Sequence, residues 1–149
     1  MKRLIISLLV AAVALGVGAA EKKALKYVDA STFTTVNKAQ NDGLPFRRLD
    51  ITKYPGLTAR MKTYFGYPTG IALRFRTDSP VIRAIWEVPD TMNRTNNPPI
   101  ASKGLDLYIK NKNGKWTFAG IGTPKYNGKK YSSTIVGDMD GSMKECMLY

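Results

Sequence analysis

Short runs of alternating apolar and polar residues constrain the fold of this chain more than any other feature. The segments 71–76, 81–88 and 105–109 place an apolar side chain at every second position. Successive side chains of a β-strand point to opposite faces, so this period predicts half-buried strands. Turns rich in Gly, Pro and Asn separate the runs, including an Asn-Gly hairpin turn at residues 111–114. The pattern predicts an all-β fold, a single jelly-roll-like β-sandwich.

The rest of the chain gives weaker expectations. We expect strands at residues 46–51, 116–119 and 143–149, and loops at residues 89–102 and 120–130. No window after the first 20 residues keeps a 3.6-residue apolar period, so no helix is expected there. The sequence stops inside an expected strand, so we expect a domain cut from a longer protein.

The amino terminus has the order of a secretory signal peptide. Lys2 and Arg3 precede an apolar run over residues 4–17, and small residues follow just before Glu21. The apolar run is shorter than the roughly 20 residues that span a bilayer. We therefore expect a signal peptide at residues 1–20 and an exported domain at residues 21–149. The mature domain would be periplasmic or extracellular and not attached to the membrane.

Charge and missing residue types exclude several classes of function. The chain has 149 residues, with 23 Lys and Arg against 11 Asp and Glu, no histidine and a single cysteine. Without imidazole there is no Ser-His-Asp or Cys-His catalysis and no His-liganded metal. One cysteine allows no intrachain disulfide and no Cys-based zinc site. We expect no cofactor, no metal and no catalytic residues. The basic residues are dispersed, so nucleic acid is not an expected partner.

Aromatic side chains are the candidates for a binding site. Flat rings can stack on sugar rings, and the candidates for carbohydrate binding are Trp86, Trp116, Tyr64 and Tyr67. Aromatic residues in strands more often belong to the core, which is the alternative for each of them. Cys146 lies among apolar residues and is expected to be a buried, unreactive thiol.

The segment 104–109, Gly-Leu-Asp-Leu-Tyr-Ile, resembles a family signature. It is similar to the Gly-x-Asp-Leu-Tyr signature of the N-terminal domain that precedes the catalytic domain in bacterial SGNH-hydrolase-type esterases. Four further segments resemble the same family in the same order: residues 27–31, 46–50, 70–75 and 138–146. Together with the signature they extend the resemblance over nearly all of the mature chain.

The resemblance implies a β-sandwich accessory domain whose partner is an SGNH catalytic domain or a separate hydrolase chain. Gly104, Asp106 and Tyr108 match the signature, which has a structural interpretation: a glycine entering the strand, then Asp and Tyr on the face opposite Leu105 and Leu107. The implied function is non-catalytic: support of the hydrolase, or positioning of a carbohydrate ester substrate. The alternatives are a stand-alone secreted protein that binds polysaccharide and a small hydrolase that uses carboxylates only.

Overall fold

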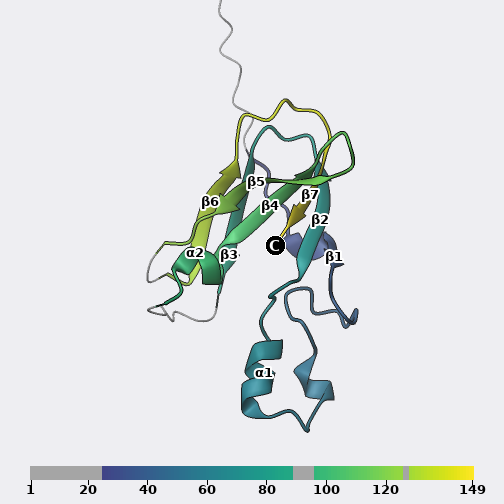
Figure 1. The fold of residues 1–149 in the computed structure, drawn as a ribbon, viewed down its shortest axis with the longest axis vertical. Helices are drawn as coiled ribbons and strands as arrows, with labels where there is room; N and C mark the ends of the chain where they lie inside the picture. Colours follow the sequence, from purple (N-terminus) through teal and green to yellow (C-terminus); the bar gives the residue numbers. More distant parts are fainter. Residues whose placement is uncertain (1–24, 89–95, 126–127) are drawn as a thin grey trace, which may run out of the picture.

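The computed structural model describes residues 25–88, 96–125 and 128–149 (Figure 1). The expected signal peptide lies outside these ranges. The described residues form seven strands: β1 (Thr34–Val36), β2 (Ala72–Thr77), β3 (Ile82–Glu87), β4 (Leu105–Lys110), β5 (Trp116–Gly122), β6 (Lys130–Val136) and β7 (Lys144–Leu148). One sheet has the order β1-β2-β7-β4-β5, and β3 pairs with β6 in the other. All these pairings are antiparallel. The prediction of an all-β sandwich is confirmed.

The core lies between the two sheets. Leu107 from β4 and Cys146 from β7 are fully buried in the five-stranded sheet, and Ile135 from β6 packs against them. Side chains of Ile82 and Ala84 from β3 complete this side of the core. Alternate residues of each strand therefore meet the core, which is the arrangement that the two-residue period predicts.

The hairpin turn expected at residues 111–114 forms, and a second turn precedes β7. In the hairpin between β4 and β5, the Asn111 N–H donates to the Lys115 carbonyl over 2.8 Å, and Gly114 has a positive φ of 77°. Before β7, the Asp140 carboxylate accepts a hydrogen bond from the Ser142 N–H over 2.9 Å. The side-chain acceptor closes the turn locally. This segment is therefore a turn between β6 and β7.

The strand expected at residues 46–51 is wrong. These residues are irregular and lead into a 3₁₀ turn, η2 (Ile51–Lys53). The Asp50 carboxylate accepts hydrogen bonds from the Thr52 N–H and hydroxyl, over 3.1 and 2.6 Å. Asp side chains that bind the backbone two residues ahead favour a turn over an extended strand.

The expected absence of helices is also wrong. Helix α1 (Ala59–Phe65) begins after Thr58, whose hydroxyl accepts a hydrogen bond from the Met61 N–H, and it ends at Gly66. Helix α2 (Pro99–Lys103) forms inside the expected loop at 89–102, of which residues 89–95 lie outside the described ranges. Helices of seven and five residues are too short to show a 3.6-residue period.

The expected loop at residues 120–130 is shorter than predicted. Strand β5 continues to Gly122, and β6 starts at Lys130. Strand β6 was not among the expected strands, although its burial alternates, with Tyr131, Ser133 and Ile135 less exposed than the residues between them. The Gly- and Lys-rich composition of residues 120–130 therefore predicted a loop where β5 ends and β6 begins.

The segment between β1 and β2 forms a lobe beyond one end of the sheets (Figure 1). We call residues 37–70 the lobe; it contains η2 and α1. No residue of the lobe is buried. Among the described residues, no helix has the length and apolar character needed to span a bilayer.

Candidate functional site

The glycine of the Gly-x-Asp-Leu-Tyr motif has a steric role. Gly104 joins α2 to β4, and its N–H donates to the Ile100 carbonyl over 3.1 Å. A Cβ atom at this position would overlap the same carbonyl oxygen. Its φ of −70° is open to any residue. Space, rather than backbone freedom, therefore requires glycine here.

The other two motif residues lie on the outside of the five-stranded sheet. Asp106 is exposed, whereas Leu107 beside it is fully buried. The Asp106 backbone pairs with Tyr149 through two hydrogen bonds of 3.1 and 2.9 Å. The Tyr108 ring meets Phe118 and Tyr149 edge-on, with ring centroids 5.8 and 5.7 Å apart. The motif thus connects β4 to both of its neighbours in the sheet.

These residues belong to a continuous surface. Residues paired across neighbouring strands share a face, and the register pairs Tyr108 with Phe118 and with Met147. Phe118 is 54% exposed. We call this surface the outer sheet face; its members include Arg74, Asp106, Tyr108, Lys110, Trp116, Phe118, Glu145, Met147 and Tyr149.

An ion-pair network crosses the outer sheet face. The Glu145 carboxylate on β7 accepts a hydrogen bond of 2.6 Å from Arg74 on β2 and one of 3.3 Å from Lys110 on β4. Desolvation acts to raise the pKa of Glu145, but the bonds and charges of the two cations outweigh it and hold the pKa below its ordinary value. The Lys110 ammonium also lies 5.6 Å from the centre of the Trp116 ring.

The site offers rings and fixed charges rather than reactive groups. Burial raises the pKa of the Cys146 thiol to about 11, so the thiol stays protonated at neutral pH. In the described ranges, no three His, Cys, Asp or Glu side chains gather as a metal site would need. Stacking and hydrogen bonding are the chemistry that this face can perform.

The four aromatic candidates from the sequence lie in three places. Trp116 is on the outer sheet face. Trp86 packs against Tyr131 at 5.4 Å between ring centroids, and its indole N–H donates to the Lys103 carbonyl over 2.8 Å, which ties β3 to α2. Tyr64 is exposed on α1, and Tyr67 follows that helix in the lobe. The structure therefore does not bring the four candidates together.

Sequence reasoning missed Phe118 and Tyr149. The signal for Phe118 was present, because a hairpin turn centred on residues 111–115 pairs Lys110 with Trp116 and Tyr108 with Phe118. The signal for Tyr149 was not, because its pairing with Asp106 depends on β7 lying beside β4.

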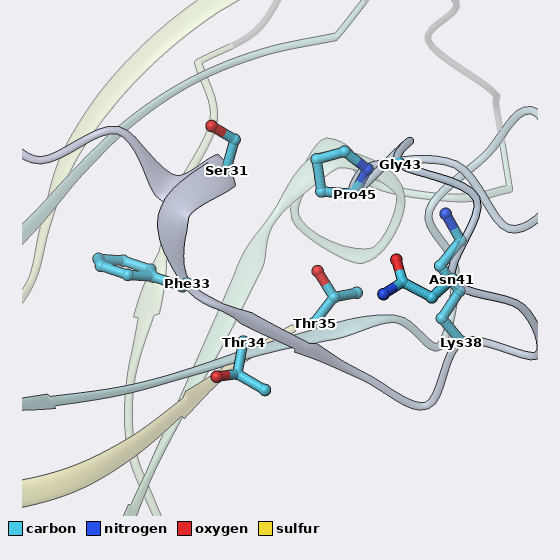
Figure 2. A pocket seen from close by; sticks show the side chains of 8 residues that line it. All are labelled: Ser31, Phe33, Thr34, Thr35, Lys38, Asn41, Gly43 and Pro45. Carbon is cyan, nitrogen blue, oxygen red and sulfur yellow. The ribbon is translucent and has the colours of Figure 1, made fainter.

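A polar cleft of about 370 Å³ lies where the lobe joins β1 (Figure 2). Figure 2 shows the side chains of Thr35 and Asn41 turned toward each other, with Pro45 across the cleft. The Lys38 ammonium at its edge binds the Asp42 carboxylate and the Leu44 carbonyl. Hydroxyl and amide groups at this cleft suit hydrogen bonds to a small polar ligand.

Comparison with known proteins places the chain in a family. Residues 25–149 match the family model GxDLY, the N-terminus of SGNH-hydrolase-type esterases. The chain belongs to this family. A GxDLY domain is the N-terminal part of such esterases, as the resemblance of the motif implied.

A solved structure agrees with this assignment. A candidate GDSL-like lipase from Bacteroides ovatus ATCC 8483 is 43% identical, with a TM-score of 0.78. The match covers 83% of this GxDLY chain and 36% of the Bacteroides ovatus chain, so our chain spans about a third of that protein. The search of curated proteins found no match.

Proposed function

We propose that this GxDLY domain is a non-catalytic accessory domain that supports an SGNH hydrolase domain. The observation that carries the proposal is the family match over residues 25–149, to the part of these esterases that precedes the hydrolase. The chain has no histidine to activate a serine nucleophile. Ester cleavage would then belong to the partner domain, and this domain would supply binding and support.

Esterase assays test this proposal directly. The purified chain should hydrolyse p-nitrophenyl acetate no faster than buffer and should not react with a fluorophosphonate probe. When the chain is joined after Tyr149 to the remaining part of the Bacteroides ovatus chain, the hydrolase should unfold at a higher temperature than without it. Turnover by the isolated chain that disappears in Asp106→Asn would support a carboxylate hydrolase and overturn the accessory role.

The outer sheet face favours a second role, positioning of a carbohydrate ester. Phe118 is exposed on the same strand as Trp116, the Lys110 ammonium lies over the Trp116 ring, and Glu145 forms an ion pair with Lys110. Aromatic faces with polar edges are suited to sugar rings. The same surface would serve a stand-alone carbohydrate-binding protein, which is the alternative function.

Binding to acetylated polysaccharides tests the second role. Wild-type chain should be retained by an acetylated xylan or mannan in affinity electrophoresis, and Phe118→Ala should weaken retention. Ile85→Ala is the matched control, because Ile85 is similarly exposed on the other sheet. Equal retention of all three proteins, or none, would contradict a carbohydrate site on this face.

We also propose export of the mature domain to the periplasm or the exterior. The charged start, short apolar run and small residues before Glu21 support it. Mass spectrometry of the chain expressed in a bacterial host should find an N-terminus at Glu21 outside the cytoplasm. Full-length chain that retains Met1 in the cytoplasm would contradict export.

A further inference from the structure

We propose that the lobe is the surface on which the SGNH hydrolase domain docks. The proposal rests on the accessory function above and adds where the two domains meet. Three independent features of the lobe support it: its missing core, its exposed side chains and its place beside the C-terminus.

The lobe has no hydrophobic core of its own. None of its residues is buried, and η2 and α1 bury none of their members. The best-hidden charged groups are instead an ion pair, Lys38 with Asp42, whose side chains are 6% and 3% exposed. This contact joins residues four positions apart and adds no burial of apolar surface, so it does not replace a hydrophobic core. A seven-residue helix is also well below the roughly 12 residues at which isolated helices become even marginally stable. The lobe therefore gains from burial against another surface.

The exposed side chains of the lobe have the composition of an interface. Phe46 is 47% exposed and Met61 is 43% exposed. Arginines lie among them: Arg48 covers the Phe65 ring at 5.8 Å, and Arg60 covers the Tyr64 ring at 5.6 Å. Interfaces are enriched in aromatic residues, Met and Arg. The complementary surface would be apolar with carboxylates at its rim.

The position of the lobe identifies the occupant. Asn37, the first residue of the lobe, donates a hydrogen bond of 3.4 Å to the Tyr149 hydroxyl. Figure 1 marks the C-terminus beside β1, at the end of the sheets from which the lobe extends. In this family the GxDLY domain is the N-terminal part of the esterase, so a hydrolase domain is reached from the C-terminal side of the GxDLY domain. A hydrolase domain joined on this side would lie next to the base of the lobe, which favours it as the occupant over a polysaccharide or a second copy of the chain.

Hydrogen exchange on the joined protein tests the docking. The chain is compared alone and joined after Tyr149 to the remaining part of the Bacteroides ovatus chain. Amides of the lobe should exchange at least about tenfold more slowly in the joined protein, while amides of β4 and β7 keep their rates. Met61→Asp and Phe46→Asp should restore fast exchange in the lobe. Ile85→Asp is the control, because Ile85 is 50% exposed on β3, away from the lobe.

The outcomes separate the docking site from the accessory role. Equal exchange of the lobe in both proteins, with the hydrolase still stabilised by this domain, would overturn the docking site and leave the accessory role standing. A hydrolase that is neither stabilised nor contacted would overturn both. Lobe protection in the isolated chain that depends on concentration would assign the surface to a second copy. Protection by polysaccharide alone would assign it to a ligand. Unchanged exchange in the sheets shows that each variant is folded.

Discussion

Two glycines in this domain mark places where two backbones approach closely. Gly104 faces the Ile100 carbonyl at the junction of α2 and β4, and Gly120 on β5 faces the Ile135 carbonyl of β6. Any side chain at either position would displace a neighbouring element. The first residue of the family motif thus preserves the packing that places Asp106 and Tyr108.

Gly104→Ala tests this steric role. Forcing a methyl group into a filled site typically costs about 1–3 kcal/mol, so the free energy of unfolding should fall by that amount. Urea denaturation followed by tryptophan fluorescence measures the change. Gly137→Ala is the matched control, because a Cβ there has no atom within 4 Å and the residue has no positive φ. Equal stability of the two variants would contradict the steric role.

The Cys146 thiol should be unreactive toward thiol reagents in the folded protein. Its side chain is fully buried, and burial raises the pKa of the thiol from 9.0 to about 11. A thiol reagent at pH 8 should react only after denaturant is added. Because the folded state disfavours the thiolate, the free energy of unfolding should decrease as the pH rises from about 9 toward 11. Cys146→Ser should lose this decrease, and rapid labelling of the native chain would refute the burial argument.

At the scale of elements, the sequence predicts the strands that have one face buried in the core and the other face exposed. Alternation identified β2, β3 and β4, and the same signal was present but unused in β6. The segment at 46–51 is apolar enough for a strand, but it has no partner strand to complete its hydrogen bonds. Local contacts decide the structure of this segment. A local contact also starts α1, where the Thr58 side chain accepts a hydrogen bond from the Met61 N–H.

The contacts of the candidate site also fall into those that the local sequence predicts and those that depend on the whole fold. The hairpin pairs Tyr108 with Phe118 over ten residues, and such a pairing follows from the turn. The contact between Arg74 and Glu145 joins residues 71 positions apart. It exists because β7 lies between β2 and β4, and this strand order depends on packing of the whole chain. Residue spacing holds no information on it.

The network at Glu145 predicts an acid-sensitive sheet. The pKa of Glu145 is lower in the folded state than its ordinary value of 4.5, because Arg74 and Lys110 outweigh desolvation. The stabilisation is therefore complete above pH 4.5 and is lost as the pH falls through the lower folded pKa. Glu145→Gln should flatten the acid side of a stability-against-pH curve.

A second substitution shows whether the effect belongs to the network. Glu87→Gln removes an exposed ion pair with Lys130 on the other sheet. Exposed pairs contribute little to stability, so this variant should follow the wild-type curve. Parallel curves for all three proteins would show that Glu145 does not link the strands energetically.

At the scale of the whole molecule, a hydrophobic core stabilises the two sheets but not the lobe. The two sheets enclose Leu107, Ile135 and Cys146, whereas the lobe encloses an ion pair and no buried apolar residue. Regions with few buried apolar contacts open at a lower free energy than the core. The lobe and the sheets should therefore respond to a perturbation separately, although one chain passes twice between them.

Limited trypsin digestion makes this difference visible. The first cuts should follow the exposed Arg47, Arg48 and Arg60 in the lobe. Arg74 and Arg76 are exposed too, but they lie in β2, whose backbone is paired with β1 and β7. A protease needs an extended, unpaired segment. If exposure alone decided cleavage, trypsin would cut after the arginines of the lobe and after those of β2. If local opening decides it, trypsin cuts first only after the arginines of the lobe. Mass spectrometry of early fragments distinguishes the two. Early cuts after Arg74 would mean that the central sheet opens as readily as the lobe, and the lobe would then have no special need of a covering domain.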